Sequence, residues 1–303
     1  MQRFGFDRFG TPDVFTVVTQ EPLQPKPGQV QLQVLGFGLN PYDASLRRGE
    51  QQASRPLKFP IIPGTDAVGR VTALGEDVNG LSEGDIVMNY RPLGGYGDYV
   101  TASANKVHIK PAALSLTDAA VLPQVGIAAY TILEQLALPD HARLTILGAG
   151  GGVGSLLLQL AKYRGLNVTA VAAANHHDQL QGLGADTILD YTQAQQQPGV
   201  LADAVVNAIG GGKDLGLSPK LVRPGGTILT TAYVDVTPGD FRHLQLGRLA
   251  PTASAFDSLA TTARTRGLTI QVAESLPFTL AGVRRGHQLL DAGHVNGKLA
   301  VMR

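Results

Sequence analysis

Five glycines stand within the seven residues 148–154, and they carry the clearest chemical signal of the chain. An apolar, β-branched run over 144–147 leads into them, an amphipathic pattern over 155–164 follows, and a second strand pattern begins at Asn167. Glycines at such a strand end let the backbone approach a pyrophosphate, and the next helix presents free N–H groups and a positive dipole end to it. The turn therefore predicts a dinucleotide site, with a glycine-rich loop that binds nothing as the alternative. The candidate contacts are Gly148, Gly151, Gly152, Val153 and Gly154.

The second strand of this unit ends without a carboxylate. In sites that prefer NAD, an Asp or Glu at this point accepts hydrogen bonds from the ribose 2′-OH, and it would repel a 2′-phosphate. Here the strand ends near Ala173, and the first carboxylate after it is Asp178. Asn175 and His176 are the nearest side-chain donors, although they could also mark a solvated helix start. The pattern favours NADP(H), with Ala173, Asn175 and His176 as candidate contacts.

Two later strand ends belong to the same candidate site. The segment 207–210 ends a fourth strand, and 231–233 ends a fifth. Because the carboxyl ends of parallel strands meet at one edge of a sheet, both segments should face the coenzyme through backbone groups. Alternatively, the glycines at 210–212 only make a turn. The candidate contacts here are Ala208, Ile209, Gly210, Ala232 and Tyr233.

The elements that position these residues follow two different patterns. Residues 1–112 contain short strand patterns separated by Gly and Pro, which is typical of a small, mostly antiparallel β domain. From about residue 113, strands and helices alternate, which predicts a parallel sheet with helices on both faces. Strand character returns at the C-terminal end, so we expect the tail to rejoin the first domain. The predicted class is α/β, with domains 1–113, completed by 275–303, and 114–274.

Composition narrows the possible partners. The 303 residues are 44% hydrophobic and 16% charged, with a net charge of +1, which argues against nucleic acid or an anionic membrane as a partner. Cysteine is absent, so no disulfide or thiolate metal site can form. No apolar run has the length of a membrane span, and residues 1–10 lack the apolar core of a signal peptide. We therefore expect a cytoplasmic protein with a small-molecule substrate.

A series of short motifs runs along the chain: GLNPYD at 38–43, RG at 48–49, IPGTDAVG at 62–69, GDIV at 84–87, GGYGDYV at 94–100, LP at 122–123, GGGVG at 150–154, LGAD at 183–186, RPGG at 223–226 and GK at 297–298. In order and spacing they resemble the zinc-free quinone oxidoreductases, the zeta-crystallin-like group of the medium-chain dehydrogenase/reductase superfamily. The resemblance implies a GroES-like domain, a Rossmann domain, NADPH and a substrate cleft between the domains. Three positions depart from the pattern, namely Ala149 in the first glycine position, Ala128 in place of a threonine, and Ser45 in place of a tyrosine or lysine.

The resemblance also implies roles for single residues. Asn40 would lie nearest the nicotinamide, although it could simply form an Asn-Pro turn. Tyr42 would protonate an enolate or only line the cleft, and Tyr191 would lie near the adenine ribose. Zinc-dependent relatives place a Cys and a His–Glu pair where this chain has Asn40 and Gly64–Asp66. Without a Lewis acid, quinones and enones are the easier acceptors, because their incoming charge spreads over a conjugated system.

The sequence thus predicts a metal-free, NADPH-dependent reductase of a quinone or an α,β-unsaturated carbonyl compound, with Asn40 and Tyr42 as catalytic residues. Two other functions stay open: a coenzyme-binding structural or regulatory protein with little turnover, and an enoyl-thioester reductase. We also expect a homodimer. In that dimer the segment 268–272, assigned as the last strand of the parallel sheet, would pair across a two-fold axis.

Overall fold

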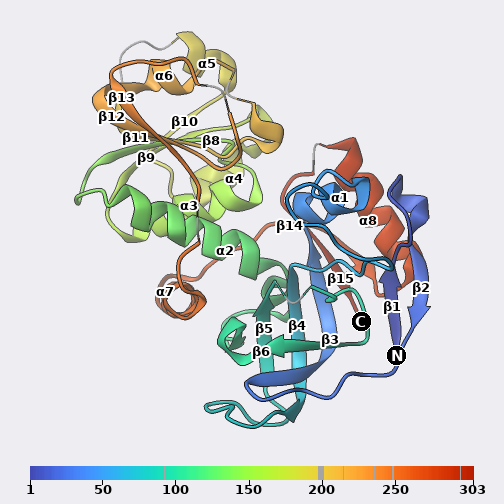
Figure 1. The fold of residues 1–303 in the computed structure, drawn as a ribbon. Coiled ribbons are helices and arrows are strands. Elements are labelled where there is room, and N and C mark those ends of the chain that lie inside the picture. The colour runs from blue at the N-terminus through green and yellow to red at the C-terminus, as the bar shows by residue number, and fades with distance from the viewer. Residues whose placement is uncertain (92, 197–200, 214, 235, 248, 294) are drawn as a thin grey trace. The chain divides into compact units, whose positions relative to one another are not determined.

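The computed structural model describes residues 1–91, 93–196, 201–213, 215–234, 236–247, 249–293 and 295–303. Within these residues the chain forms two compact units, each with its own large sheet (Figure 1). Unit 1 comprises residues 1–124 and 270–303, and unit 2 comprises residues 125–269. One long helix, α2 (Leu116–Leu136), begins in unit 1 and ends in unit 2.

Unit 1 is organised around the strand β3 (Gln29–Leu39). The seven-stranded sheet has the order β14-β15-β3-β4-β5-β7, and β6 also pairs with β3. All of its pairs are antiparallel except β14 with β15. Strand β3 is buried along most of its length, which suits its run of valine and leucine. The other elements of the N-terminal part are β1 (Gln2–Gly5), η1 (Pro12–Val14), β2 (Thr16–Thr19), α1 (Pro41–Arg48), β4 (Asp66–Leu74), β5 (Ile86–Tyr90), β6 (Tyr99–Ser103), η2 (Ala104–Lys106) and β7 (Val107–Ile109).

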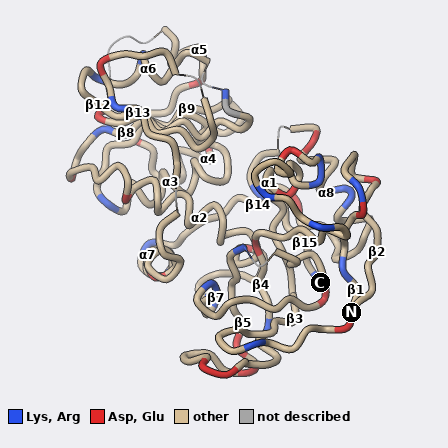
Figure 2. Tube along the Cα trace, viewed as in Figure 1, with Lys and Arg blue, Asp and Glu red and all other residues tan. Residues whose placement is uncertain are grey.

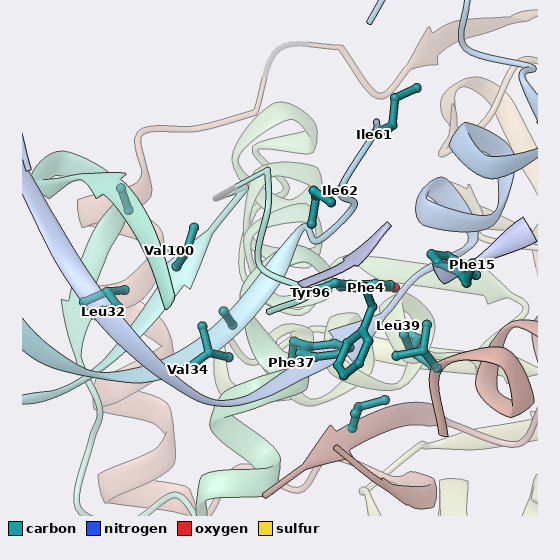
Figure 3. Packing of buried hydrophobic residues seen from close by; sticks show 14 of the residues in the cluster. Phe4, Phe15, Leu32, Val34, Phe37, Leu39, Ile61, Ile62, Tyr96 and Val100 are labelled. Carbon is teal, nitrogen blue, oxygen red and sulfur yellow. The ribbon is translucent and has the colours of Figure 1, made fainter. Parts of the chain in front are cut away.

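Aromatic rings and branched aliphatic side chains together form the core of unit 1 (Figure 3). Phe37 of β3 stacks on Tyr96 with 4.3 Å between the ring centroids, and both side chains are fully buried. Phe4 and Phe15 lie close to this pair (Figure 3). Burying a ring of this size stabilises the fold by about 1.5–3 kcal/mol. The packing holds the C-terminal end of β3 in place, and Asn40 follows directly after it.

The C-terminal segment completes the sheet of unit 1. It forms β14 (Val272–Pro277), α8 (Leu280–Ala292) and β15 (Lys298–Met302). Thr279 caps α8, since its hydroxyl accepts a hydrogen bond from the Gly282 N–H at 3.1 Å. Strand β15 runs antiparallel to β3, with Leu299 opposite Leu39. This register places Lys298 beside the end of β3.

Unit 2 contains a six-stranded parallel sheet in the order β10-β9-β8-β11-β12-β13. Helix α3 lies on one side of the sheet, and α5 and α6 lie on the other (Figure 1). The strands are β8 (Arg143–Leu147), β9 (Asn167–Val171), β10 (Thr187–Leu189), β11 (Ala202–Asn207), β12 (Val222–Thr230) and β13 (Phe241–Gln245). The helices are α3 (Gly152–Tyr163), η3 (Ala174–His176), α4 (His177–Gly182), α5 (Tyr191–Gln196), η4 (Gly210–Gly212), α6 (Ser218–Leu221) and α7 (Thr252–Arg266).

The prediction of a sheet strand at 268–272 was wrong. Residues 267–271 are outside any strand, and β14, which begins at Val272, pairs with β15 in unit 1. Thr269 instead forms two backbone hydrogen bonds with the side chain of Gln159. Its N–H donates to Gln159 Oε1, and its carbonyl oxygen accepts from Gln159 Nε2, both at 2.9 Å. The sixth strand of the parallel sheet is β13, which the sequence analysis missed because most of its residues are polar or exposed.

Helix α2 is the one described helix that is long and apolar enough to span a membrane, judged by length and composition. However, 72% of that window is buried inside the protein, so the helix belongs to the core. Basic and acidic residues both occur in each of the two units (Figure 2). This agrees with the net charge of +1.

Candidate functional site

The glycine turn, residues 148–154, joins β8 to α3 and fits closely around its own backbone. Gly148 has φ = 77°, and a Cβ there would meet the backbone of Ala208 and Ile209 at 2.9 Å. A Cβ on Gly154 would lie 2.3 Å from the carbonyl oxygen of Gly148. A Cβ on Gly151, by contrast, would contact only that same oxygen, at 3.4 Å. The turn is therefore closed on its inner side and open at Gly151, which leaves room for a phosphate to approach the backbone.

The turn lies where the strand order of the parallel sheet reverses. After β8 the chain builds β9 and β10 on one side, and then returns to place β11 on the other side of β8. In open parallel sheets this switch point is where ligands bind, at the carboxyl ends of the strands. Ala208 follows β11 and donates its N–H to Leu147 O at 2.9 Å, while the Ile209 N–H bonds to Asn207 Oδ1 at 3.0 Å.

The candidate ribose contacts gather at the same edge of the sheet. Two exposed residues follow β9: Ala173 lies directly before η3, and Asn175 lies within it. The ring of His176 lies against the turn, within 2.7 Å of a Cβ built on Gly150. Burial raises the pKa of Tyr191, and a hydrogen bond between its hydroxyl and the backbone of Gly148 acts in the opposite direction. The Tyr191 hydroxyl therefore also borders the turn.

The remaining coenzyme candidates occupy the strand ends on the other side of β8. Gly210 begins η4 just after β11. Ala232 and Tyr233 follow β12, and Tyr233 is 79% exposed, so its ring is available to a ligand. Gly152 and Val153 form the first turn of α3. All the predicted coenzyme residues therefore lie in unit 2, at the carboxyl edge of one sheet.

Asn40 and Tyr42 lie in unit 1, and Asn40 belongs to a buried polar network. This Asn40 network consists of Asn40, Asp43, Thr65, Asp66 and Lys298. The Asn40 amide donates to Asp66 Oδ2 at 2.8 Å and to Thr65 Oγ1 at 2.9 Å, and its oxygen accepts from Lys298 Nζ. Asn40 is only 1% exposed. Both of its N–H groups are thus already used within the protein.

Burial dominates the electrostatics of the Asn40 network. It raises the pKa of Asp43 to about 7, with a further contribution from the nearby Asp66. It also raises the pKa of Asp66 to about 6, although the ammonium of Lys298 opposes this. The pKa of Lys298 is lowered by burial, while Asp66 acts against the shift. Two acids and one base share the same closed space, and burial favours the uncharged form of each of them.

Local backbone features explain why these side chains meet. Asp43 forms a capping box at the start of α1, where its carboxylate accepts from the Asn40 N–H at 3.0 Å. Pro123 interrupts the hydrogen bonds inside α2, and the next N–H, that of Gln124, donates to Asp66 Oδ1 at 2.7 Å. The sequence analysis gave Lys298 no role. The available signal was a lysine at the start of an otherwise apolar strand pattern, 298–302.

Tyr42 is half-buried and sits between two arginines that the sequence analysis also missed. Arg55 donates to the Tyr42 hydroxyl oxygen at 3.2 Å. The guanidinium of Arg91 lies over the Tyr42 ring, 5.3 Å from its centroid, and 5.9 Å from the centroid of Tyr90. No spacing rule connects positions 42, 55 and 91, because only the folded chain brings them together.

The donor set of the Asn40 network does not suit a metal ion. Where zinc-dependent relatives hold a Cys and a His–Glu pair, this chain has the amide of Asn40, the hydroxyl of Thr65 and the carboxylate of Asp66. The ammonium of Lys298 lies 3.8 Å from Asp66 Oδ2. A cation inside the cluster repels a second cation. Across the described part of the chain, no three His, Cys, Asp or Glu side chains come together as a metal site requires.

Comparisons with known proteins define the class. Residues 26–112 match the alcohol dehydrogenase GroES-like domain, and residues 152–264 match the zinc-binding dehydrogenase family. The predicted α/β fold, a GroES-like β domain with a Rossmann domain, is confirmed. The chain belongs to the zinc-free quinone oxidoreductase group of the medium-chain dehydrogenase/reductase superfamily.

Three similar proteins illustrate this membership. A chloroplastic quinone-oxidoreductase homolog of Spinacia oleracea is 32% identical over 229 residues, which cover 71% of this chain and 68% of the relative. A chloroplastic NADPH-dependent alkenal/one oxidoreductase of Arabidopsis thaliana is 28% identical over 301 residues, which cover 91% of this chain and 72% of the relative. The structure of a quinone oxidoreductase from Coxiella burnetii has a TM-score of 0.87 at 28% identity, covering 100% of this chain and 99% of that one.

Proposed function

We propose that this protein is an NADPH-dependent oxidoreductase that reduces a quinone or an α,β-unsaturated carbonyl compound. The glycine turn carries the proposal: it stands at the switch point of a parallel sheet, is open at Gly151, and has no carboxylate between Ala173 and His177. The names of the spinach and Arabidopsis relatives support the same chemistry. The absent carboxylate favours the phosphorylated coenzyme, because a negative charge there would repel a 2′-phosphate.

The protein would hold NADPH mainly through backbone groups. The N–H groups of the glycine turn would face the pyrophosphate, and the exposed donors of η3 would face the 2′-phosphate. When bound, NADPH supplies a hydride, so the acceptor needs one proton in addition. The residues proposed to hold the coenzyme are Gly148, Gly151, Gly152, Val153, Gly154, Ala173, Asn175, His176, Tyr191, Ala208, Ile209, Gly210, Ala232 and Tyr233.

Tyr42 is the proposed donor of a hydrogen bond or proton to the acceptor. Its oxygen accepts from Arg55, which leaves its own O–H proton to point elsewhere. The guanidinium groups of Arg55 and Arg91 add positive charge at the same place. Positive charge there stabilises the negative charge that develops on the acceptor oxygen during reduction. A metal ion is not needed for this step when the charge is delocalised over a quinone or enone.

Asn40 is proposed to act from within its network. Its N–H groups bond to Thr65 and Asp66, and to contact a nicotinamide it would have to release one of them. In its present position it caps α1 and so fixes Tyr42, two residues further along. We therefore propose that Asn40 positions Tyr42, and that the Asn40 network is the support of the acceptor site.

Unit 1 is proposed to bind the acceptor and unit 2 the coenzyme. We also propose a homodimer, but the segment 268–272 cannot extend the parallel sheet. The sheet has two edge strands, β10 and β13, and we propose that a second copy adds its strands at β13. A cytoplasmic location is proposed because the sequence contains no cysteine.

The test is oxidation of NADPH, followed at 340 nm, with a panel of quinones and enones. We expect turnover with both acceptor types and a higher kcat/KM for NADPH than for NADH. Binding of NADPH without oxidation by any acceptor would instead favour the non-catalytic alternative. Turnover restricted to enoyl thioesters would favour the enoyl-thioester reductase.

A further inference from the structure

Two guanidinium groups converge on one tyrosine of unit 1. Arg55 donates to the Tyr42 hydroxyl at 3.2 Å, and Arg91 covers the ring of the same residue at 5.3 Å. Tyr42 and Arg55 are half-buried, and Arg91 is exposed. A ligand that reaches the Tyr42 hydroxyl would therefore meet two positive charges, both in contact with solvent.

These two arginines differ from Arg47 and Arg48 of α1, which are neutralised by a carboxylate. Arg47 and Arg48 form ion pairs with Asp291, at 2.6 and 2.8 Å. In the described part of the chain, neither Arg55 nor Arg91 has a carboxylate within 4.0 Å. An arginine without an acid partner keeps its donors for an anion from outside, and its planar fork suits a carboxylate.

The backbone of Arg91 adds independent support. Arg91 has φ = 50°, in the left-handed region that residues other than glycine rarely adopt. Its N–H donates to Thr65 O at 2.7 Å, which holds this conformation directly beside the Asn40 network. Strained backbone of this kind is concentrated at functional sites, where the position of a side chain outweighs the strain. Here it fixes the turn after β5 that carries the guanidinium over Tyr42.

We propose that Arg55 and Arg91 bind a carboxylate carried by the acceptor, so that the preferred substrate is an anionic quinone or enone. This inference rests on the proposed reductase function, since it takes Tyr42 as the residue beside the acceptor. The anion would be steered to the site by the two charges, and would be held by charge-assisted hydrogen bonds that leave Tyr42 facing the conjugated carbonyl.

The test compares two acceptors of closely matched intrinsic reactivity, (E)-6-oxo-4-heptenoate and its methyl ester, in which two methylene groups separate the carboxyl group from the enone. The wild type should show at least a tenfold higher kcat/KM for the acid, because only the acid can form charge-assisted hydrogen bonds with the two arginines. The double variant R55Q/R91Q should lose this preference, so that the ratio falls towards one. Any effect on Tyr42 itself changes both acceptors alike and cancels in the ratio.

Arg70→Gln is the matched control, because Arg70 is an exposed arginine of β4 whose guanidinium donates to Gly84 O at 3.2 Å. It should keep the wild-type ratio. A ratio near one in the wild type would overturn the proposal while leaving the reductase function intact. The proposal would also be overturned if R55Q/R91Q kept the wild-type ratio of kcat/KM for the acid and the ester but bound NADPH tenfold more weakly. The two arginines would then bind a phosphate of the coenzyme.

A binding measurement separates this proposal from the reductase function. Calorimetry with the unreactive 4-oxopentanoate, in the presence of NADP⁺, should detect binding to the wild type at least tenfold tighter than to R55Q/R91Q, with no such difference for its methyl ester. If neither enone is reduced but this difference is found, the anion site stands and the reductase function fails for these acceptors. Equal affinity of both proteins for 4-oxopentanoate would overturn the anion site whatever the activity.

Discussion

The glycine turn of unit 2 and the Asn40 network of unit 1 are both polar sites, but they are built in opposite ways. The turn consists of seven consecutive residues without a charged side chain, and it offers backbone N–H groups through the open side at Gly151. The Asn40 network consists of five side chains from three distant segments, and each of them is already bonded to another. The turn can therefore receive a ligand, whereas the network mainly supports its neighbours.

The comparison also separates what each region contributes to stability. Three ionisable groups of the Asn40 network are removed from water, and each depends on the others to remain there. The glycine turn depends instead on the lack of side chains at a few positions. Substitutions in the network should consequently change the stability of unit 1, and substitutions in the turn should divide into those that disturb folding and those that disturb binding.

The largest effect is expected for Lys298→Met. Removing the ammonium leaves Asp66 and the Asn40 oxygen buried without their cation, which should lower the free energy of unfolding by about 3–5 kcal/mol. Urea unfolding measures this directly, with the exposed Lys58→Met as the control. The double variant D66N/K298M should recover part of the loss, because no unpaired charge remains. A loss below about 1 kcal/mol for K298M would show that the network is not electrostatically coupled.

Two alanine substitutions in the glycine turn sharpen the contrast. Gly154→Ala places a Cβ 2.3 Å from Gly148 O and should destabilise the protein by about 1–3 kcal/mol. Gly151→Ala meets no atom closer than 3.4 Å, so the midpoint of thermal unfolding should hardly change. Its methyl group nevertheless occupies the open side, and NADPH affinity should fall about tenfold, or 1.4 kcal/mol. Equal NADPH affinity of G151A and the wild type would place the pyrophosphate elsewhere.

Tyr42→Phe tests the functional residue that the Asn40 network supports. If the hydroxyl donates to the acceptor, kcat should fall by about 10²-fold, in the range of a lost general acid, while NADPH affinity stays constant. The control is Tyr163→Phe, an exposed tyrosine at the end of α3 outside the proposed sites, which should leave kcat nearly unchanged. Steady-state kinetics and a coenzyme titration provide both values. An unchanged kcat in Y42F would reduce Tyr42 to a residue that only lines the site.

The smallest effect is a change in pH dependence. Burial raises the pKa of Asp43 to about 7 from the usual 3.8, so the folded protein favours the neutral carboxyl. This stabilisation is complete below pH 3.8 and is lost as the pH rises through about 7. Asp43→Asn should therefore flatten the decline of stability between pH 4 and 7, although it also weakens the cap of α1. Urea midpoints measured between pH 4 and 7 test this, with the exposed Asp257→Asn as control. If D43N shows the same slope of stability against pH as the wild type, Asp43 is not the titrating group.

The regions also differ in how far the sequence could predict them. The glycine turn, its flanking strands and the parallel sheet are local patterns, since Gly148 to Gly154 lie between a β-branched run and an amphipathic helix. The resemblance to known reductases added Asn40 and Tyr42. The segment 268–272 was misassigned because its alternation matches a strand, whereas in the fold Thr269 bonds to the side chain of Gln159.

The Asn40 network and the arginines could not be predicted in this way. Lys298 reaches Asn40 only because β15 pairs with β3, which joins residues 258 positions apart. Arg55 and Arg91 meet at Tyr42 through a loop and a left-handed turn, neither of which has a repeating pattern. Such sites depend on tertiary pairing, and a single sequence carries no periodicity that reports it.

Calorimetric titration of the purified protein with NADPH and NADH tests whether the glycine turn binds the coenzyme. We expect saturable binding of NADPH at one site per chain, with weaker binding of NADH and a clear loss of affinity in G151A. No detectable uptake of either coenzyme by the folded protein would contradict it.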